Sequence, residues 1–287
     1  MTDRWISLHA FHRTGTDLLL VTAVDGLIKE LDGRLDRYFF LRYWEGGPHL
    51  RLRLLPRVPD DAATIGRRAT AVLEEYLAAY PATTPWDREG YALLAAEFAR
   101  QEGLAAYDER LRPDDHVEAI AYRPEYAMYG GPEAVDAVER HFTDSSRIAL
   151  AILRGEPDPR RRLGHALTAM MLTLMAWEPD PGRLASVLAG ERDRWDPAPA
   201  RARHAEIFAG RRDALTAQAE RCRRIATSGS TWWRSVDALQ RRLADLQLDS
   251  RIVLERCVHL FCNRLGLSIA EEAHLRYLTA ATLEKAS

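Results

Sequence analysis

The chain has 287 residues, enough for one large domain or two closely associated ones around a buried core. Hydrophobic residues make up 47% and charged residues 29% of the chain, and 40 Lys plus Arg nearly balance 42 Asp plus Glu. This balance excludes a global basic field, so we expect no direct binding of nucleic acid and no binding to an anionic membrane surface.

Three cysteines, Cys222, Cys257 and Cys262, lack the spacing of metal ligands, and their odd number argues against a disulfide framework. The first residues contain no apolar signal segment, and no apolar run is long enough to span a membrane. We therefore expect a cytoplasmic protein in which the cysteines are ordinary core residues.

The first part of the sequence is rich in predicted strands. Residues 5–11 alternate between polar and apolar and predict a strand, and residues 16–31 have helical spacing. Two further strands, 37–43 and 49–55, are separated by a Gly-Gly-Pro connector, which favours an antiparallel pair. An amphipathic helix over 61–80 follows.

The remainder is predicted to be mainly helical. Residues 81–131 are the least regular, with one predicted strand at 117–122 and a Gly-Gly-Pro turn at the end. Helical spacing then covers 132–154, 161–177, 200–227, 231–247, 250–266 and 269–284. The sequence thus predicts an α+β fold as one compact unit: a single domain, 1–287, with an N-terminal antiparallel β-sheet in a β-rich part, 1–131, followed by a mainly helical C-terminal part, 132–287.

The predicted strand at 49–55 carries the most informative polar pattern. Because alternate residues of a strand share one face, His49, Arg51 and Arg53 project to one side and the intervening leucines to the other. Two guanidinium groups about 7 Å apart can hold a carboxylate or stabilise an oxyanion. The alternative is a half-exposed strand with a solvated basic face.

A second candidate is His259, on the predicted helix over 250–266. Asn263 shares its face at i+4 spacing, and a histidine titrates near neutral pH and can transfer protons. The alternative is a structural histidine. The segment from Tyr122 to Gly131 adds Glu125 and Tyr129 before a tight turn, which can equally be a surface turn. The sequence contains no metal-binding or nucleotide-binding motif, so we expect no metal and no cofactor.

Taken together and in this order, these segments resemble the thiopeptide-type bacteriocin biosynthesis domain, the glutamate-elimination domain of class I lanthipeptide dehydratases, here as a stand-alone member. The resemblance spans essentially the whole chain. It is carried by the strand from Trp5, by residues 38–43, 47–53 and 122–131, by Phe142-Thr143-Asp144-Ser145-Ser146-Arg147, and by residues 259–265.

The resemblance implies a lyase of lanthipeptide or thiopeptide biosynthesis. A separate glutamylation protein, dependent on glutamyl-tRNA, esterifies Ser or Thr of a precursor peptide, and the elimination domain removes a Cα proton and expels glutamate. The product is dehydroalanine or dehydrobutyrine. Binding of the precursor peptide through its leader and core, and self-association as a homodimer, are also implied.

By carry-over from the family, Arg51, Arg53 and His259 are the expected catalytic residues. The first two would stabilise charge and the third would transfer the proton. Glu125 would be a supporting carboxylate, and we count it with His49, Tyr129 and Asn263 as substrate-binding.

One position departs from the family pattern. Relatives that dehydrate peptides usually have an arginine where this chain has Met128. That departure favours an alternative activity known in the same family, the pyridine synthase of thiopeptide assembly, which joins two dehydroalanines in a formal [4+2] cycloaddition with loss of the leader peptide. The retained arginine pair favours elimination. A non-catalytic leader-binding subunit is the third interpretation.

Overall fold

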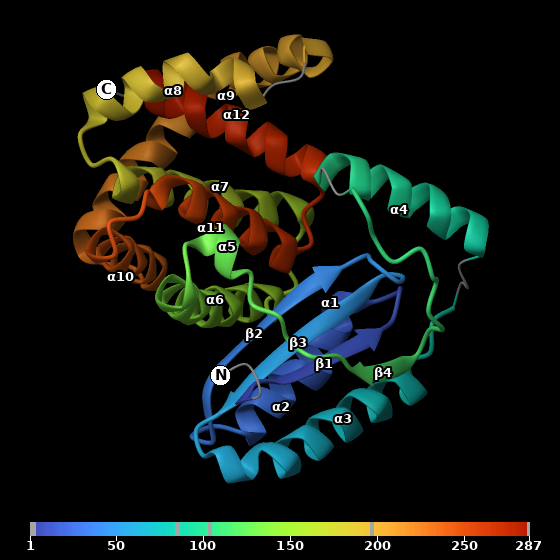
Figure 1. Cartoon of the computed structure of the whole chain (residues 1–287). Helices are drawn as coiled ribbons and strands as arrows, with labels where there is room; N and C mark the ends of the chain where they lie inside the picture. Colours follow the sequence, from blue (N-terminus) through green and yellow to red (C-terminus); the bar gives the residue numbers. More distant parts are fainter. Residues whose placement is uncertain (1–3, 84–86, 103–104, 196–197, 286–287) are drawn as a thin grey trace. The chain divides into compact units, whose positions relative to one another are not determined.

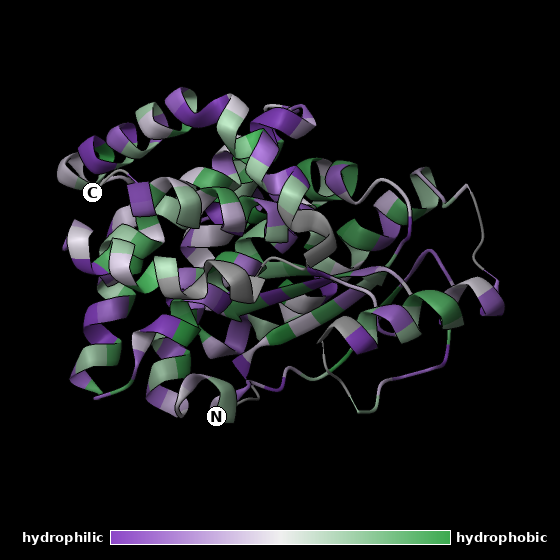
Figure 2. Cartoon of the chain, turned by 90° about the horizontal axis from the view of Figure 1, so that it is seen from above, coloured by the Kyte–Doolittle hydropathy of each residue, from purple (hydrophilic) through white to green (hydrophobic). Residues whose placement is uncertain are grey.

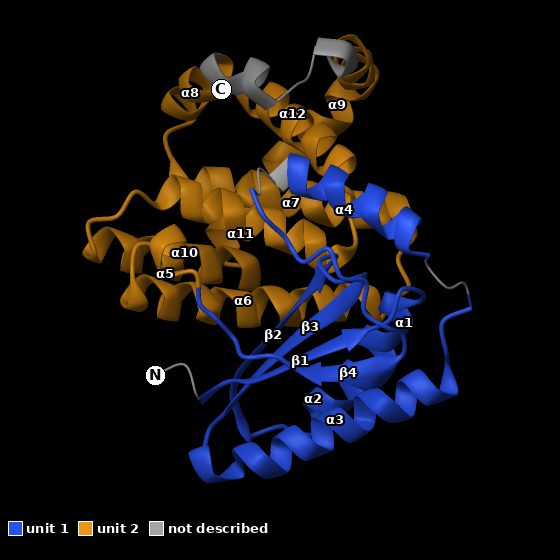
Figure 3. Cartoon of the chain, turned by 45° about the vertical axis from the view of Figure 1, so that its right-hand side comes forward, with its two compact units in different colours: residues 1–124 blue, residues 125–287 orange. Residues whose placement is uncertain are grey.

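The computed structural model describes residues 4–83, 87–102, 105–195 and 198–285. The chain divides into two units, residues 1–124 and residues 125–287 (Figure 3). The first contains the β-sheet and is called the sheet unit; the second is helical and is called the helical unit. The order of a sheet followed by helices confirms the predicted α+β class.

The sheet unit is built on one four-stranded antiparallel sheet (Figure 1). Its order is β2-β3-β1-β4, with neighbouring strands antiparallel. The strands are β1 (Ile6–Phe11), β2 (Leu35–Tyr43), β3 (His49–Pro56) and β4 (His116–Ala119). The predicted hairpin of β2 and β3 is confirmed. Its connector contains Gly46 and Gly47 at φ 82° and 108°, values that favour glycine.

Helices cover one face of this sheet. The predicted helix over 16–31 is present as α1 (Thr16–Leu19), a π-helical segment η2 (Leu20–Val24) and α2 (Asp25–Glu30). After a short 3₁₀ turn, η3 (Pro59–Asp61), the helix α3 (Ala62–Ala79) follows, and it packs on β1, β3 and β4 (Figure 1). The three leucines of β3, at positions 50, 52 and 54, are fully buried, as the alternation predicts.

The region after Pro81 is more regular than expected. A helix, α4 (Arg88–Glu102), occupies part of the segment that the sequence left without regular structure. Its hydrophobic and polar residues are only weakly segregated, which removes the usual sequence signal. The helix is held instead by a small cluster around Trp44, in which Tyr91, Ala95 and Ala99 are buried.

In its described residues, the helical unit begins with one turn of helix, α5 (Tyr126–Tyr129), and continues through seven longer helices. These are α6 (Pro132–Leu153), α7 (Pro159–Trp177), α8 (Pro181–Trp195), α9 (Ala198–Ser228), α10 (Thr231–Asp245), α11 (Ser250–Leu265) and α12 (Ile269–Lys285). Six of the seven correspond to predicted helices, whereas α8 was not predicted. A capping box begins α12: Ser268 and Glu271 exchange hydrogen bonds there.

A buried arginine joins two segments that carry the family resemblance. Arg264 of α11 is fully buried and donates hydrogen bonds to the hydroxyl groups of Ser146 and Ser145 on α6, at 3.0 and 3.2 Å. Its guanidinium also lies 5.0 Å from the centre of the Phe142 ring. These residues therefore hold α6 and α11 together in the core of the helical unit.

Hydrophobic and hydrophilic residues are both present on each helix seen in Figure 2, as in helices with one buried and one exposed side. No helix within the described ranges combines the length and the apolar character needed to cross a membrane. The three cysteines are buried and unpaired by disulfides.

Candidate functional site

The polar face of β3 is arranged as the alternation predicts. Leu50, Leu52 and Leu54 point into the core, and the intervening His49, Arg51 and Arg53 share the opposite face. In the antiparallel register, Arg51 lies opposite His9 of β1 and Arg53 lies opposite Ser7. The neighbouring strand thus adds a histidine to this face.

This face is not the solvated basic surface that was the alternative interpretation. Arg53 is only 6% exposed, His49 3% and His9 4%, and Arg51 is partly buried. The four side chains define what we call the sheet cluster: His9, His49, Arg51 and Arg53. Burial of two cations on one strand calls for compensation, since a buried charge without a partner is costly.

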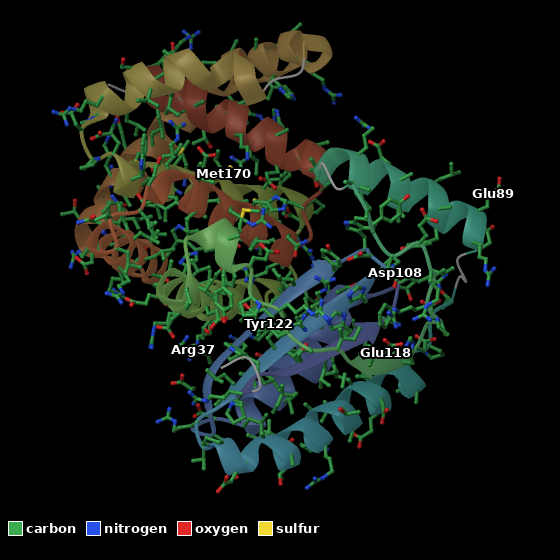
Figure 4. All side chains as sticks on the ribbon, in the orientation of Figure 1. Arg37, Glu89, Asp108, Glu118, Tyr122 and Met170 are labelled. Carbon is green, nitrogen blue, oxygen red and sulfur yellow. The ribbon has the colours of Figure 1, made fainter. Side chains whose placement is uncertain are left out.

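The contacts of Arg53 are with uncharged groups. Its Nη2 donates to His9 Nε2 at 2.9 Å, and its Nη1 makes a weak contact with the Leu52 carbonyl at 3.4 Å. The guanidinium lies 5.5 Å from the centre of the Tyr122 ring, which follows β4 (Figure 4). Within the described part of the chain, no carboxylate pairs with Arg53. Burial and the charge of Arg51 lower the pKa of Arg53 to about 9, so the group remains protonated at neutral pH.

Arg51 is more fully compensated than Arg53. Its guanidinium carbon lies 3.3 Å from the centre of the Tyr43 ring, and its Nη2 lies 3.7 Å from a carboxylate oxygen of Glu45. Its Nε donates to His49 Nε2 at 3.3 Å. The two arginines of the strand therefore differ: one is paired with an acid and an aromatic ring, and the other is not paired with an acid.

The two histidines of the sheet cluster are neutral. Their rings stack with centroids 4.9 Å apart. Burial and the neighbouring arginine charges lower the pKa of His9 to about 2, and burial is also the main cause that lowers the pKa of His49 to about 3. His49 Nδ1 donates to the Gly47 carbonyl at 2.8 Å, so its Nε2 is free to accept from Arg51.

His9 was not among the predicted site residues. β1 has the same alternation as residues 49–55, and it places Ser7, His9 and Phe11 on one face. Only the register between β1 and β3 brings His9 opposite Arg51. The alternation was visible in the sequence, whereas the pairing was not.

In the helical unit, Glu125 and Tyr129 both accept hydrogen bonds from a third residue, Arg256 of α11. Arg256 donates to the Tyr129 hydroxyl at 3.2 Å and to the Glu125 carboxylate at 3.0 Å. Burial opposes the charged form, but the neighbouring Tyr129 and Glu125 outweigh it, so the pKa of Arg256 is raised. Met128 lies on the same short helix with 47% of its surface exposed. Arg256 of α11 therefore holds the short helix α5 and the preceding Glu125 against α11.

His259 lies on α11 and pairs with Glu272, a carboxylate that was not among the predicted site residues. Its Nδ1 is 2.7 Å from an oxygen of Glu272 on α12, and 41% of its side chain is exposed. Glu272 itself is only 6% exposed. Asn263 follows one turn later on α11 and is partly exposed. The predicted residues thus form separate groups: His49 and both arginines in the sheet unit, and Glu125, Tyr129, His259 and Asn263 in the helical unit.

A hollow in the helical unit has about 610 Å³ of empty space and a mainly apolar wall that includes Met170 (Figure 4). Two arginines line it, and each is paired with an acid: Arg251 with Glu255 at 3.1 Å, and Arg276 with Glu272 at 2.8 Å. The hollow therefore lacks the uncompensated positive charge that Arg53 gives to the sheet cluster. Among the described residues, no group of three or more His, Cys, Asp or Glu side chains is placed to hold a metal ion.

Solved structures that are similar to this chain include TbtD, TsrL and MibB. The pyridine synthase TbtD of thiomuracin biosynthesis is 20% identical with a TM-score of 0.79, and the alignment covers 98% of this chain and 97% of TbtD. TsrL is 17% identical with a TM-score of 0.67, over 98% and 94% of the two chains. At these identities the likeness concerns the fold.

The third structure is the tRNA-dependent lantibiotic dehydratase MibB from Microbispora sp. 107891, which is 21% identical with a TM-score of 0.59. The alignment covers 97% of this chain but 28% of MibB, so the chain corresponds to one part of that larger enzyme. No curated protein matches the sequence.

The family comparison covers almost the whole sequence. Residues 5–283 match the family described as "Lantibiotic biosynthesis dehydratase C-term". This match confirms the resemblance drawn from the sequence and indicates an enzyme in the maturation of ribosomally synthesised peptides. The chain belongs to the lantibiotic biosynthesis dehydratase C-terminal family, whose members act on precursor peptides.

Proposed function

We propose that the chain is a lyase that eliminates glutamate from glutamylated Ser or Thr of a precursor peptide. In this reaction a base removes the Cα proton, the electron pair forms the Cα–Cβ double bond, and the Cβ–O bond breaks. Glutamate leaves with that oxygen in its carboxylate. The products are free glutamate and a peptide that contains dehydroalanine or dehydrobutyrine.

The observation that carries the proposal is the environment of Arg53. An arginine that is 6% exposed and whose guanidinium has no carboxylate partner among the described residues favours an anionic ligand. The leaving glutamate provides carboxylates, and the enolate-like charge that follows loss of the Cα proton also needs donors that are already in place.

The remaining residues of the sheet cluster support Arg53. Arg51 adds a second cation on the same strand, and its partial pairing with Glu45 leaves it less available than Arg53. His9 and His49 are neutral, so they orient the guanidinium groups without adding positive charge. An anion bound here would therefore meet hydrogen-bond donors that are already held in place.

His259 is the proposed proton-transfer residue, because it is a partly exposed histidine with a hydrogen-bonded carboxylate behind it. Glu125, Tyr129 and Asn263 are proposed to contact the peptide. Glu125 does so while paired with Arg256, which supplies a cation close to the turn that carries Met128.

A separate glutamyl-tRNA-dependent glutamylation protein would supply the substrate, so the experiment uses a precursor peptide that is already glutamylated. We expect the purified chain to release free glutamate and to yield a dehydrated peptide, both measured by mass spectrometry. The variants Arg53→Gln and His259→Asn should accumulate the glutamylated peptide. Unchanged turnover in both variants would exclude these residue assignments.

One observation favours a second candidate function. The position occupied by the exposed Met128 lacks the arginine expected for dehydrating relatives, and a pyridine synthase has no glutamate to hold. The same assay separates the two functions if a peptide that contains two dehydroalanines is added. Ring formation with loss of the leader peptide, in the absence of glutamate release, would support the pyridine synthase.

A further inference from the structure

Glu272 lies between two cationic side chains in the helical unit. One carboxylate oxygen, Oε2, is 2.7 Å from His259 Nδ1. The other oxygen, Oε1, accepts from Arg276, whose Nε and Nη2 lie at 2.9 and 2.8 Å. Arg276 and Glu272 are one turn apart on α12, while His259 comes from α11. Each oxygen of this buried carboxylate therefore has a different and fixed partner.

This arrangement keeps Glu272 ionised. Burial acts to raise the pKa of Glu272, but the hydrogen bond from His259 and the charge of Arg276 outweigh it and hold the pKa below its usual value. An ionised carboxylate only accepts hydrogen bonds. The nitrogen of His259 that faces it must therefore carry a proton, even when the ring is neutral.

We propose that Glu272, held by Arg276, is the positioning residue that fixes the tautomer of His259, with the proton on Nδ1 and the lone pair on Nε2. Nε2 is then the atom that accepts or donates a proton. This role for Nε2 depends on the proposed elimination activity, whereas the tautomer itself does not. Carboxylates that orient a histidine through Nδ1 act in the same way in other proton-transfer sites.

The variant Glu272→Gln tests the proposal because the amide has one acceptor and one donor end. Arg276 donates to the Oε1 position from two nitrogens, so the amide oxygen must face Arg276 and the amide NH₂ must face His259. Nδ1 can then only accept, and the proton moves to Nε2. A side chain of almost unchanged shape thus reverses the tautomer.

The tautomer is read from ¹⁵N chemical shifts of the imidazole nitrogens in protein labelled at histidine, at a pH where the ring is neutral. The His259 signals are identified by their absence in His259→Asn. We expect Nδ1–H in the unmodified chain and Nε2–H in Glu272→Gln. A neutral ring with Nε2–H in the unmodified chain, or an unchanged tautomer in Glu272→Gln, would overturn the proposal.

Two further variants act as controls. Glu271→Gln changes the preceding carboxylate, which bonds to Ser268, and should leave the tautomer unchanged. In the double variant Glu272→Gln with Arg276→Met, the amide is free to turn its oxygen to His259, so Nδ1–H should return. Persistence of Nε2–H in the double variant would exclude the part assigned to Arg276.

Glutamate release from a glutamylated peptide provides the second readout. We expect Glu272→Gln to lower kcat by about 10²-fold or more, with little change in KM, and the double variant to recover part of the loss. A reversed tautomer with unchanged kcat would exclude Nε2 as the proton-transfer atom. If no protein releases glutamate although the tautomers change as expected, the elimination activity fails and the assignment of Glu272 stands.

Discussion

In the sheet unit, Arg53 is buried without a carboxylate partner among the described residues, and it donates a hydrogen bond to the neutral His9. In the helical unit, the buried Glu272 is paired with both His259 and Arg276. The two sites thus differ in how buried charge is compensated. At Arg53 a positive charge has no carboxylate partner among the described residues, whereas both oxygens of Glu272 have cationic or donor partners.

This difference suggests that the two sites have different roles in the proposed reaction. An uncompensated buried cation is unfavourable in the free protein and becomes favourable when an anion binds. A compensated histidine needs no ligand and can transfer a proton from a fixed orientation. We therefore associate the sheet cluster with binding of the glutamyl group and His259 with proton transfer, and the following predictions test this association.

The largest effect is expected at His259. The variant His259→Asn should lower the rate of glutamate release by about 10²- to 10⁴-fold, because the proton-transfer group is lost. Asparagine can still donate to Glu272, so the thermal unfolding temperature should change little. The control is His165→Asn, which alters an exposed histidine on α7 and should retain full activity. Equal activity of the two variants would contradict the assignment.

A smaller loss is expected at Arg53. We predict that Arg53→Gln lowers kcat/KM by about 10²- to 10³-fold, as loss of one preorganised donor typically does. The unfolding temperature should stay the same or rise, since an uncompensated buried charge is removed.

The matched control for Arg53 is Arg42→Gln, on the neighbouring strand. Arg42 is paired with Asp17 and lies opposite Leu50, on the other face of the sheet. Its loss should not affect activity and should lower stability. A lower stability of Arg53→Gln than of Arg42→Gln would contradict an uncompensated charge at Arg53.

The stability of the sheet unit should depend on pH. His9 and His49 are neutral in the folded chain, where burial lowers their pKa values to about 2 and about 3. In the unfolded chain both bind protons below the ordinary histidine pKa of 6.5. The contribution of these two histidines to the stability of the fold is therefore fully present above about pH 6.5 and is lost as the pH falls. The free energy of unfolding changes by at most about 1.4 kcal/mol per pH unit for each histidine.

Hydrogen exchange followed by mass spectrometry measures the pH dependence of stability in each unit separately. Amide protection is compared between about pH 7 and pH 5, after correction for the intrinsic exchange rate. The strands, which contain two such histidines, should lose protection more steeply than the helices around His141, whose pKa burial lowers to about 3. The variant His49→Asn should reduce the slope for the strands. An unchanged slope would assign the acid sensitivity to other groups.

The smallest effect is expected at Glu125. Its side chain is 54% exposed and its partner Arg256 is 35% exposed, and exposed ion pairs contribute under about 1 kcal/mol. We expect Glu125→Gln to lower kcat/KM by less than about fivefold. Glu133→Gln, which breaks a similarly exposed pair with Arg242, is the control and should have no effect. A loss of 10²-fold would give Glu125 a direct part in the chemistry.

Local patterns in the sequence predicted a large part of the architecture. The alternation in residues 49–55 identified the face shared by His49, Arg51 and Arg53, and the glycine connector identified the hairpin. The sequence did not reveal α4 or α8. The weak segregation of apolar and polar residues in α4 explains the first omission, because that helix is held by Trp44, which precedes it by more than forty positions.

The sequence by itself determined the fold class, the family and the identity of most candidate residues, because these depend on short-range periodicity and on residue order. Only the tertiary structure decided how the charges are paired. His9 reaches Arg53 across 44 positions through strand register, and Glu272 reaches His259 across 13 positions through the packing of α12 on its neighbours. Such pairings depend on distances between elements, which no local pattern encodes.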